Sequence, residues 1–243
     1  MSDSRKVALV TGSSRGIGSE IALRLARDVF KEIVNCSGNT EPADQVAKQI
    51  GAAGGDALVI KADVSNTPAV IAMFDEAERA FGGIDVVVNC AGILKLAPLA
   101  EFDDRTFDQT IAVNLKGTFN VSREAARRVR EGGRIINFSS SVVRLPTYGV
   151  YIASKAAVEG MTQVLAQEMR GRNISVNAVA PGPVATELFF ERKSDELIAN
   201  MAKMNPLERF GQPQDIAGIV AFLAGPDGGW INGQIIRGNG GMC

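Results

Sequence analysis

The chain has 243 residues, 46% of them hydrophobic, carries a formal net charge of −1 at pH 7 and contains no histidine. The absence of histidine excludes Ser-His-Asp hydrolysis, Cys-His proteolysis and His-ligated metal sites, and we predict no metal site. Basic and acidic residues are interleaved, which indicates neither a nucleic-acid footprint nor a polybasic membrane surface.

The cysteines and the apolar runs indicate a cellular compartment. Cys36, Cys90 and Cys243 show no CxxC spacing, as is typical of proteins in a reducing compartment. The first six residues contain no hydrophobic signal segment, and no apolar run approaches the about 20 residues that span a bilayer. We therefore expect a cytoplasmic protein without membrane association.

Seven short runs of apolar and β-branched residues alternate with helix-like segments. They cover residues 7–10, 33–36, 57–60, 86–89, 135–138, 174–179 and 234–236. Runs that are apolar at consecutive positions are typical of strands covered on both faces. The alternation predicts right-handed βαβ units and thus a Rossmann-like α/β fold, a doubly wound parallel sheet with helices on both faces. No linker or repeat divides the chain, so we expect one domain over residues 1–243.

Turn-forming and polar residues follow five of the predicted strands. They are Thr11-Gly12, Asp63, Asn89 to Gly92, Ser139 to Ser141 and Pro181-Gly182. In doubly wound sheets, ligands bind beyond the carboxyl ends of the strands. Packing alone does not explain this distribution, so the sequence predicts a ligand site at that edge.

A glycine-rich turn follows the first predicted strand and opens a helix that ends near Arg27. It has the sequence Thr11-Gly12-Ser13-Ser14-Arg15-Gly16-Ile17-Gly18. Glycines allow a close approach to a ligand, and a helix N-terminus offers N–H groups and a positive dipole end to phosphate. The turn lacks the Gly-Lys-Ser/Thr ending of a P-loop and differs from the usual G-x-G-x-x-G spacing. We predict dinucleotide contacts from Gly12, Ser14, Arg15, Gly16, Ile17 and Gly18.

The end of the second strand bears on the choice between NAD and NADP. Residues 35–39 read Asn-Cys-Ser-Gly-Asn and lack the carboxylate that usually holds the ribose hydroxyls of NAD. A carboxylate there would repel the extra phosphate of NADP, so its absence favours NADP. Arg15 and Ser37 are candidate phosphate ligands, although Arg15 alone is equally well explained as an exposed loop residue.

Tyr151 and Lys155 lie four residues apart, so a helix brings the phenol and the ammonium to one face. A nearby positive charge lowers the pKa of a tyrosine from about 10 and suits it to acid–base chemistry. Taken alone, the pair also fits an amphipathic helix with a half-buried tyrosine and a solvated lysine. The pattern around it is amphipathic, with one apolar stripe formed by Ala157, Met161, Val164 and Leu165. Lys155, Glu159 and Gln163 lie on other faces.

With these motifs in order, the chain resembles the short-chain dehydrogenase/reductase family, in its branch of about 250 residues. The resemblance runs over residues 7–241, and the chain is most similar to bacterial 3-ketoacyl-carrier-protein reductases and generic oxidoreductases. Its markers are the Thr11–Gly18 turn, Asn89-Cys90-Ala91-Gly92, Asn114, the serine cluster, Tyr151-x3-Lys155 and Pro181-Gly182.

The resemblance implies hydride transfer between NADP(H) and a carbonyl or secondary alcohol. Tyr151 would donate the proton, Lys155 would lower the pKa of Tyr151 and bind the nicotinamide ribose, and Asn114 would help to carry a water-linked proton relay. A serine hydroxyl would hold the substrate oxygen. Further cofactor contacts would come from Asp63 and Val64 at the adenine, from Asn89, Ala91 and Gly92, from Pro181 and Gly182, and from Val184 and Thr186 at the carboxamide.

Two departures from the family pattern affect the site. Many members carry the serine thirteen residues before the tyrosine, where this chain has Phe138. Alignment of the preceding strand favours Ser140, while Ser139 and Ser141 remain open. Cys90 replaces the second asparagine of Asn-Asn-Ala-Gly, and we expect it to affect packing only. Tyr148 has no lysine four residues on, so we interpret it as a pocket wall.

The region from residue 188 to Asn205-Pro206 lies where the family carries a mobile substrate loop, and an amphipathic helix packed on the body explains it as well. Phe189, Phe190, Leu145 and Tyr148 indicate an apolar or mixed pocket for a small carbonyl or alcohol. A run of arginines is most simply a solvated helix face, but with Arg172 it is also a candidate surface for an acyl-carrier-protein thioester. The run comprises Arg123, Arg127, Arg128 and Arg130.

The last predicted strand and residues 238–241 resemble segments that pack between subunits, so we expect a homotetramer by analogy. Two other functions remain open. A redox-sensing NADP-binding protein without turnover would not need the Tyr151–Lys155 pair. An epimerase or dehydratase of the extended branch usually carries a G-x2-G-x2-G loop and a larger C-terminal domain, which this sequence lacks.

Overall fold

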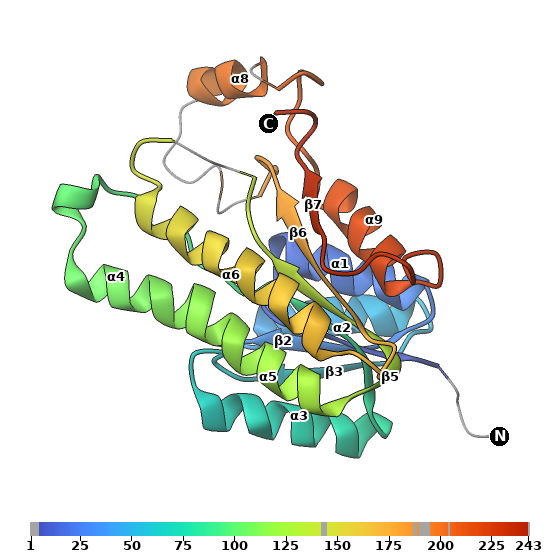
Figure 1. The fold of residues 1–243 in the computed structure, drawn as a ribbon. Coiled ribbons are helices and arrows are strands. Elements are labelled where there is room, and N and C mark those ends of the chain that lie inside the picture. The colour runs from blue at the N-terminus through green and yellow to red at the C-terminus, as the bar shows by residue number, and fades with distance from the viewer. Residues whose placement is uncertain (1–4, 142–144, 187–188, 190–194, 204, 243) are drawn as a thin grey trace.

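A computed structural model describes residues 5–141, 145–186, 189, 195–203 and 205–242 (Figure 1). Within these residues, one sheet of seven strands has the order β3-β2-β1-β4-β5-β6-β7, and each neighbouring pair is parallel. The strands are β1 (Val7–Val10), β2 (Lys31–Cys36), β3 (Ala57–Lys61), β4 (Ile84–Asn89), β5 (Val129–Phe138), β6 (Ser175–Pro181) and β7 (Ile235–Gly238). The predicted doubly wound parallel sheet is confirmed.

The observed strand boundaries differ most from the predicted ones in β5. It begins at Val129, six residues before the predicted run, and its first part contains the exposed Arg130 and Glu131. Gly132 and Gly133 follow, and the register with β4 is irregular at this point. The hydrophobic pattern marks only the part of the strand that pairs in regular register with β4 and β6, because polar residues and glycines separate it from the buried Val129.

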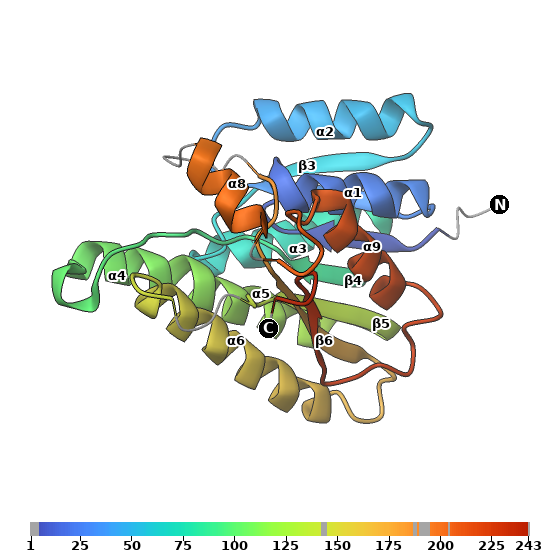
Figure 2. The ribbon, with the colours of Figure 1, turned by 90° about the horizontal axis from the view of Figure 1, so that it is seen from above.

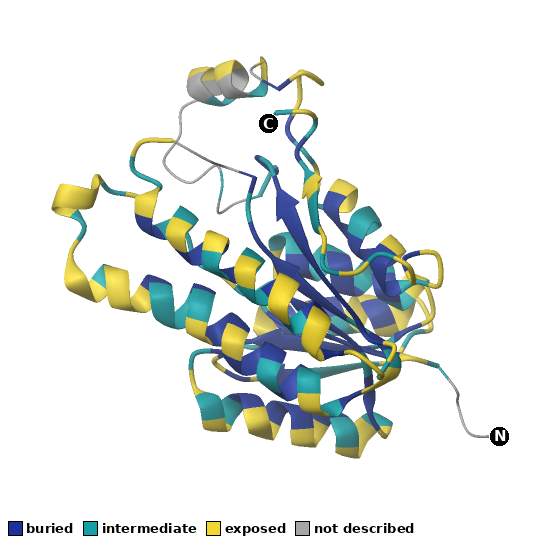
Figure 3. Ribbon diagram, viewed as in Figure 1, coloured by how far each residue is buried: buried dark blue, intermediate teal, exposed yellow. Residues whose placement is uncertain are grey.

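Helices cover both faces of the sheet (Figure 2). One face carries α1 (Gly16–Arg27), α2 (Glu41–Ala52) and α9 (Pro213–Ala224), and the other carries α3 (Thr67–Phe81), α5 (Thr118–Arg128) and α6 (Gly149–Glu168). In β1, Ala8 and Val10 face the α1/α9 side, whereas Val7 and Leu9 face the α3/α5 side. All four are buried, like most of the central strands (Figure 3), which explains the consecutive apolar residues.

The remaining helices lie nearer the carboxyl ends of the strands. They are η1 (Leu99–Glu101), α4 (Asp104–Ile111), the π-helix η2 (Ala112–Gly117) and α8 (Asp195–Lys203). The chain runs from α4 through η2 into α5, and π-helical turns of this kind often mark functional sites. No helix of the described residues has both the length and the apolar character needed to cross a bilayer.

Helix α6 is turned differently from the orientation that its apolar stripe suggests. Val164 is 58% exposed, and the other members of the stripe are only partly buried. The residues buried against the body are instead Val150, Ser154, Lys155, Val158, Thr162 and Ala166. This face tolerates polar groups because they find partners: the Thr162 hydroxyl donates to the Val158 carbonyl and accepts from Asn137.

A buried polar network lies just below the carboxyl ends of β4 and β5. The Asn89 amide donates to the side-chain oxygen of Asn137 (2.8 Å) and to the Ser122 hydroxyl (3.1 Å). The Asn137 amide donates in turn to Thr162 (2.9 Å). Four elements, β4, β5, α5 and α6, are therefore fixed to one another beneath the strand ends that carry the candidate site.

Candidate active site

The strand order reverses between β1 and β4, which is where dinucleotides bind in doubly wound sheets. The turn after β1 and the loop after β4 touch there, because a Cβ added to Gly12 would lie 2.8 Å from the Cα of Ala91. Gly12 also has φ of +65°, which a side chain would disfavour. The contact leaves backbone without large side chains at the point where the strand order reverses.

Helix α1 begins directly beside this stretch of backbone. A Cβ on Gly18 would lie 2.4 Å from the Gly12 carbonyl oxygen, so the first turn of the helix packs against the loop itself. The N-cap residue Arg15 is extended and exposed. The first N–H groups of a helix have no partner within it, and here they lie at the positive end of the dipole beside the loop. Ser14 lies in the same turn, and Gly16 and Ile17 open the helix, a geometry that suits an anion.

Two polar side chains that the sequence analysis did not assign to the site hold the loops in place. Asn35, at the end of β2, accepts from the Gly12 N–H (3.1 Å) and donates to the carbonyls of Ile60 and Ala62. The Thr11 hydroxyl accepts from the N–H groups of Cys90 and Ala91, each at 3.1 Å. A polar residue inside an otherwise apolar strand was the available signal for Asn35.

The end of β2 carries the side chains suited to a phosphate. Ser37 is exposed there, as is Arg15 at the start of α1. Lys61, at the end of β3, pairs in register with Cys36 and is also exposed. Burial raises the pKa of the Cys36 thiol, and the Lys61 ammonium opposes that shift. Lys61 therefore brings a second positive charge to this end of the site, which the sequence analysis missed.

The residues after β3 shape the adjoining wall. Val64 is buried, and its carbonyl accepts from the Asn120 amide (2.9 Å). Asp63 is exposed and accepts from the N–H (2.9 Å) and the hydroxyl (2.8 Å) of Ser65. These bonds fix the turn that leads from β3 into α3.

Tyr151, Lys155 and Ser140 converge at the carboxyl end of β5. The Lys155 ammonium nitrogen lies 5.8 Å from the centroid of the Tyr151 ring, and the Ser140 side chain hydrogen-bonds to Tyr151. Lys155 is only 5% exposed and donates to the Phe138 carbonyl (2.8 Å). Lys155 also approaches Gly92, whose added Cβ would lie 3.6 Å from its nitrogen. The acid–base pair thus borders the cofactor loops.

The expected lowering of the tyrosine pKa does not occur in this structure. Burial raises the pKa of Tyr151 to about 12, and the hydrogen bond from Ser140 opposes that shift only in part. Burial also lowers the pKa of Lys155 to about 8. The physical reason is desolvation, which disfavours the charged form of both groups and is the largest cause of each shift. At neutral pH Tyr151 is a protonated hydroxyl and therefore a proton donor.

The three serines after β5 have different partners. The Ser139 hydroxyl donates to the Glu159 carboxylate (2.6 Å), and the Ser141 hydroxyl donates to the Ala180 carbonyl (2.5 Å). Both residues are buried, whereas Ser140 is partly exposed and contacts Tyr151. The geometry favours Ser140 as the substrate-binding serine, in line with the alignment of the strand.

Asn114 is fully buried in the π-helix η2. Its side chain accepts from the Ile93 N–H (2.8 Å), donates to the Ile93 carbonyl (2.9 Å) and reaches Ser154 (3.3 Å). Asn114 therefore connects the loop after β4 to helix α6 one residue before Lys155.

The chain after β6 returns to the glycine loop. Gly182 donates to the Gly238 carbonyl (3.0 Å), and Val184 is buried and bridges to Gly211. The Thr186 methyl lies 3.6 Å from the position of a Cβ on Gly16. Pro181 is buried at the end of β6, and the segment that follows it lies beside the glycine turn.

Comparison with known proteins decides the family. The family described as Enoyl-(Acyl carrier protein) reductase matches residues 12–243. A "Short-chain type dehydrogenase/reductase" from Picea abies is 50% identical over 249 residues, covering 98% of this chain and 92% of its own length. The chain belongs to the short-chain dehydrogenase/reductase family.

Two further relatives bear on the cofactor. The "NADPH-dependent aldehyde reductase-like protein, chloroplastic" of Arabidopsis thaliana is 45% identical over 97% of this chain and 93% of its own. A Burkholderia cenocepacia short-chain dehydrogenase solved in complex with NADP is 38% identical, with a TM-score of 0.92 over 98% of this chain and 97% of that one. This short-chain dehydrogenase/reductase is an NADP-dependent oxidoreductase that acts on carbonyl or CH–OH groups.

The residues of this enzyme fit NADP. The bare backbone at Gly12 and Gly18 admits a pyrophosphate close to the start of α1. At the end of β2, Ser37 and the cations Arg15 and Lys61 suit the extra phosphate. Cys90, in the loop that lines the cofactor side, is a neutral thiol whose pKa burial raises to about 12.

Three of the four residues predicted to line an apolar substrate pocket lie within the described residues. The Tyr148 ring lies edge-on to Tyr151 with centroids 6.4 Å apart, and Phe189 packs edge-on against Phe210 at 5.3 Å. Leu145 is 40% exposed, and its carbonyl accepts from the Tyr148 N–H (3.3 Å). Phe190 and the rest of residues 190–194, like 187 and 188, lie outside the described residues.

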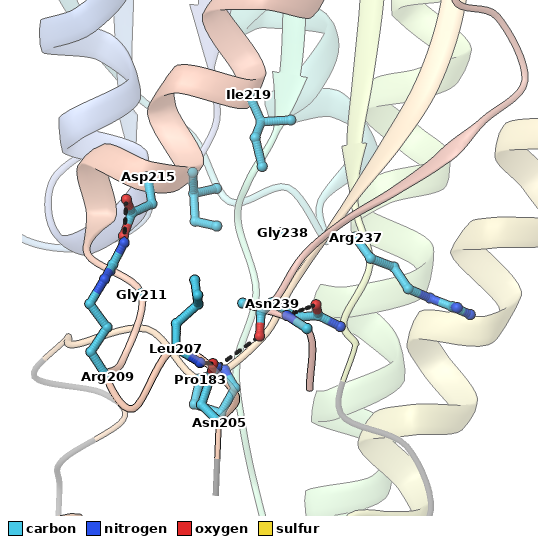
Figure 4. Close-up of a pocket in the computed structure, with 13 residues that line it drawn as sticks. Pro183, Asn205, Leu207, Arg209, Gly211, Asp215, Ile219, Arg237, Gly238 and Asn239 are labelled. Atoms are coloured by element: carbon cyan, nitrogen blue, oxygen red, sulfur yellow. Dashed lines mark hydrogen bonds and ion pairs between the residues drawn. The ribbon is translucent and has the colours of Figure 1, made fainter. Parts of the chain in front are cut away.

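A separate cavity of about 270 Å³ opens between α9 and the end of β7 (Figure 4). The Arg209 guanidinium pairs with Asp215 at its rim, at 2.6 and 3.1 Å, while Arg237 extends away from it. No predicted site residue lines this cavity. The described residues hold no cluster of three or more His, Cys, Asp or Glu side chains that suits a metal ion.

The arginine run does not form the free basic surface considered from the sequence. Arg128 bonds to Glu78 and Asp75, Arg130 to Asp85, and both Arg123 and Arg127 pair with Glu124. Arg172 donates to backbone carbonyls of residues 126 and 129. The charges of these arginines are therefore paired within the chain. Helix α5 ends where β5 starts, at the edge of the sheet opposite Tyr151 and Lys155. The ion pairs favour the solvated helix face, and the surface for an acyl-carrier-protein thioester stays a prediction.

Proposed function

We propose that the enzyme reduces uncharged aldehydes and ketones with NADPH, with Tyr151 as the proton donor. The observation that carries the proposal is the Ser140–Tyr151 hydrogen bond beside the buried Lys155. Two adjacent hydroxyl groups suit a carbonyl oxygen, because each can donate to it as negative charge develops. The apolar groups around Tyr148 favour a substrate without formal charge.

Each group of the site has one role in this proposal. When bound, NADPH supplies the hydride that reduces the carbonyl carbon. The Ser140 hydroxyl holds the substrate oxygen, and the Tyr151 hydroxyl passes its proton to that oxygen. The Lys155 ammonium stabilises the phenolate left behind and would hold the nicotinamide ribose. Asn114 holds the loop after β4 and begins the route by which water returns the proton.

The test is NADPH consumption by the purified protein on a carbonyl panel, with NADH as the cofactor control. The panel holds aliphatic and aromatic aldehydes, diketones, quinones and an acetoacetyl thioester, the last because the matching family is described by an acyl-carrier-protein substrate. Turnover that prefers NADPH supports the proposal. Tight NADPH binding without turnover on any member would instead support the sensor hypothesis, which the reductase relatives disfavour.

Reduction is expected to slow as the pH rises above about 8, the pKa to which burial lowers Lys155. Below that pH Lys155 is cationic, and above it the charge that stabilises the phenolate is lost. Tyr151 stays protonated throughout, because its pKa is about 12. The kcat/KM for an aldehyde, measured against pH, reports these groups in the free enzyme. Lys155→Arg keeps its charge and should abolish the decline. A wild-type profile that stays level up to about pH 10 would contradict the assignment.

Arg15→Ala is expected to weaken NADPH binding by about 10-fold or more and to leave NADH binding nearly unchanged. A charged hydrogen bond to the extra phosphate would be lost, whereas NADH lacks that phosphate. Fluorescence titration with both cofactors measures the effect, with Lys61→Ala as a parallel variant. An equal loss for NADPH and NADH would show that Arg15 does not contact the phosphate.

We also propose a homotetramer in a reducing compartment such as the cytoplasm. Two separate faces carry exposed apolar side chains: Phe107, Phe119 and Val164 on α4, α5 and α6, and Phe222 and Trp230 near β7. Trp230 is 98% exposed in the single chain, and β7 is an edge strand. Two faces of this kind suit a closed assembly with two kinds of interface. Sedimentation that gives the mass of one chain would refute the tetramer. The free thiols of Cys36 and Cys90 support the compartment.

A further inference from the structure

The backbone at Thr147 is strained. Its φ of +72° lies in the left-handed region, and Thr147 is β-branched. Such side chains rarely adopt this conformation, because the Cβ substituents crowd the backbone. Residues held in this way persist only where surrounding contacts determine them, and they gather at functional sites. Thr147 lies four residues before Tyr151.

Contacts on both sides hold Thr147. Its carbonyl accepts from the Ala97 N–H (3.2 Å), which joins the loop after β4 to the start of α6. Tyr148 donates back to the Leu145 carbonyl (3.3 Å), closing a turn around Thr147. Leu99 packs on Gly149 so closely that an added Cβ would lie 2.8 Å from its Cδ2. Two loops that meet the active site are thus locked together at the strained residue.

The strained residue directly precedes Tyr148. Tyr148 is the N-cap of α6, and its carbonyl accepts from Ile152 (2.9 Å), so its ring direction depends on the backbone just before it. The ring lies edge-on to Tyr151 at an interplanar angle of 75° and is half-buried. Leu96, Leu99 and Leu145 are exposed on the same two segments, and residues 93–100 and 145–150 include one charged residue, Lys95.

We propose that Thr147 is a positioning residue whose left-handed backbone sets the Tyr148 ring beside Tyr151, and that Tyr148 selects flat, apolar carbonyl substrates such as aromatic aldehydes. The inference rests on the proposed reduction at Tyr151. An aromatic ring beside the carbonyl would pack against Tyr148, whereas a short aliphatic chain would not reach it. Thr147 acts on specificity through Tyr148, without touching the substrate.

The experiment compares benzaldehyde with propanal in the wild type, Thr147→Gly, Thr147→Asn and Tyr148→Ala. Glycine frees the backbone, so Thr147→Gly should raise KM for benzaldehyde about 10-fold relative to propanal, with kcat for propanal nearly unchanged. Asparagine tolerates the left-handed region, so Thr147→Asn should keep the wild-type ratio and raise the melting temperature by about 2–4 °C. Tyr148→Ala should lose the benzaldehyde preference as Thr147→Gly does.

Val29 provides the matched control. It is also β-branched, has φ of +70° and lies 61% exposed between α1 and β2, far from Tyr151 in the fold. Val29→Asn should raise the melting temperature without changing the substrate ratio. If the ratio of KM for benzaldehyde to KM for propanal is unchanged in Thr147→Gly or in Tyr148→Ala, these residues do not determine specificity. If Thr147→Asn lowers the melting temperature, the Thr147 backbone is not strained. A wild type that reduces neither these aldehydes nor any other member of the carbonyl panel refutes the proposed reduction instead, and the melting temperatures of the variants then still test whether Thr147 is strained.

Discussion

Replacing Tyr151 by phenylalanine is expected to lower kcat for carbonyl reduction by about 10³-fold while NADPH still binds. The change removes the phenolic oxygen and little else, so the packing of the ring beside Lys155 remains. Burial holds the hydroxyl protonated at neutral pH, which makes it the donor whose loss stops the transfer. Steady-state NADPH oxidation and a fluorescence titration of the cofactor measure the two effects separately.

The neighbouring serines supply the control for this prediction. Ser140→Ala removes the hydroxyl that bonds to Tyr151 and should lower kcat by about 10²-fold. Ser139→Ala removes a hydroxyl that is bound to Glu159 and should mainly affect stability. Full activity in Tyr151→Phe would mean that another group donates the proton, and equal losses in both serine variants would remove the assignment of Ser140.

Glu32→Met is expected to raise the free energy of unfolding by about 1–3 kcal/mol near pH 8. Glu32 is fully buried in β2 between Ala8 of β1 and Ala57 of β3. Within the described structure, neither of its carboxyl oxygens has a hydrogen-bond partner. Methionine has a similar length and no polar oxygen, so it fills the same space without the desolvation cost. Urea unfolding of the two proteins measures the difference.

The pH dependence of the free energy of unfolding distinguishes the cost of burying the Glu32 carboxylate from an effect of packing. Burial raises the pKa of Glu32 well above its ordinary value of 4.5, so the folded protein holds a proton that the unfolded chain releases. The stability that this proton provides is complete below pH 4.5 and is lost as the pH rises toward the pKa in the folded state. Glu32→Met and Glu32→Gln should both flatten this decline. A gain for Glu32→Met that is equal at every pH would show that packing, not ionisation, is responsible.

The sequence by itself determined the sheet, the cofactor loop and the spacing of Tyr151 and Lys155. Strands of a parallel sheet are buried on both faces, so their consecutive apolar residues mark them without knowledge of their neighbours. A glycine turn between a strand and a helix acts through its own backbone, and two residues four apart on a helix share a face wherever the helix packs. Each of these features depends on local geometry.

Only the tertiary structure decided how the local pieces act together. The apolar stripe of α6 is only partly buried, with Val164 exposed, because the inner face of the helix meets polar partners from β5, which no helical periodicity reveals. The pKa of Tyr151 rises because distant segments exclude water from it, and Ser140 is distinguished from its neighbours by the partners that Glu159 and Ala180 provide to them. Thr147 is strained through a contact fifty residues away in the chain, at Ala97. Burial, solvent exclusion and long-range hydrogen bonds are properties of the folded chain. They determine the pKa values and the partners of these side chains, which the sequence alone does not give.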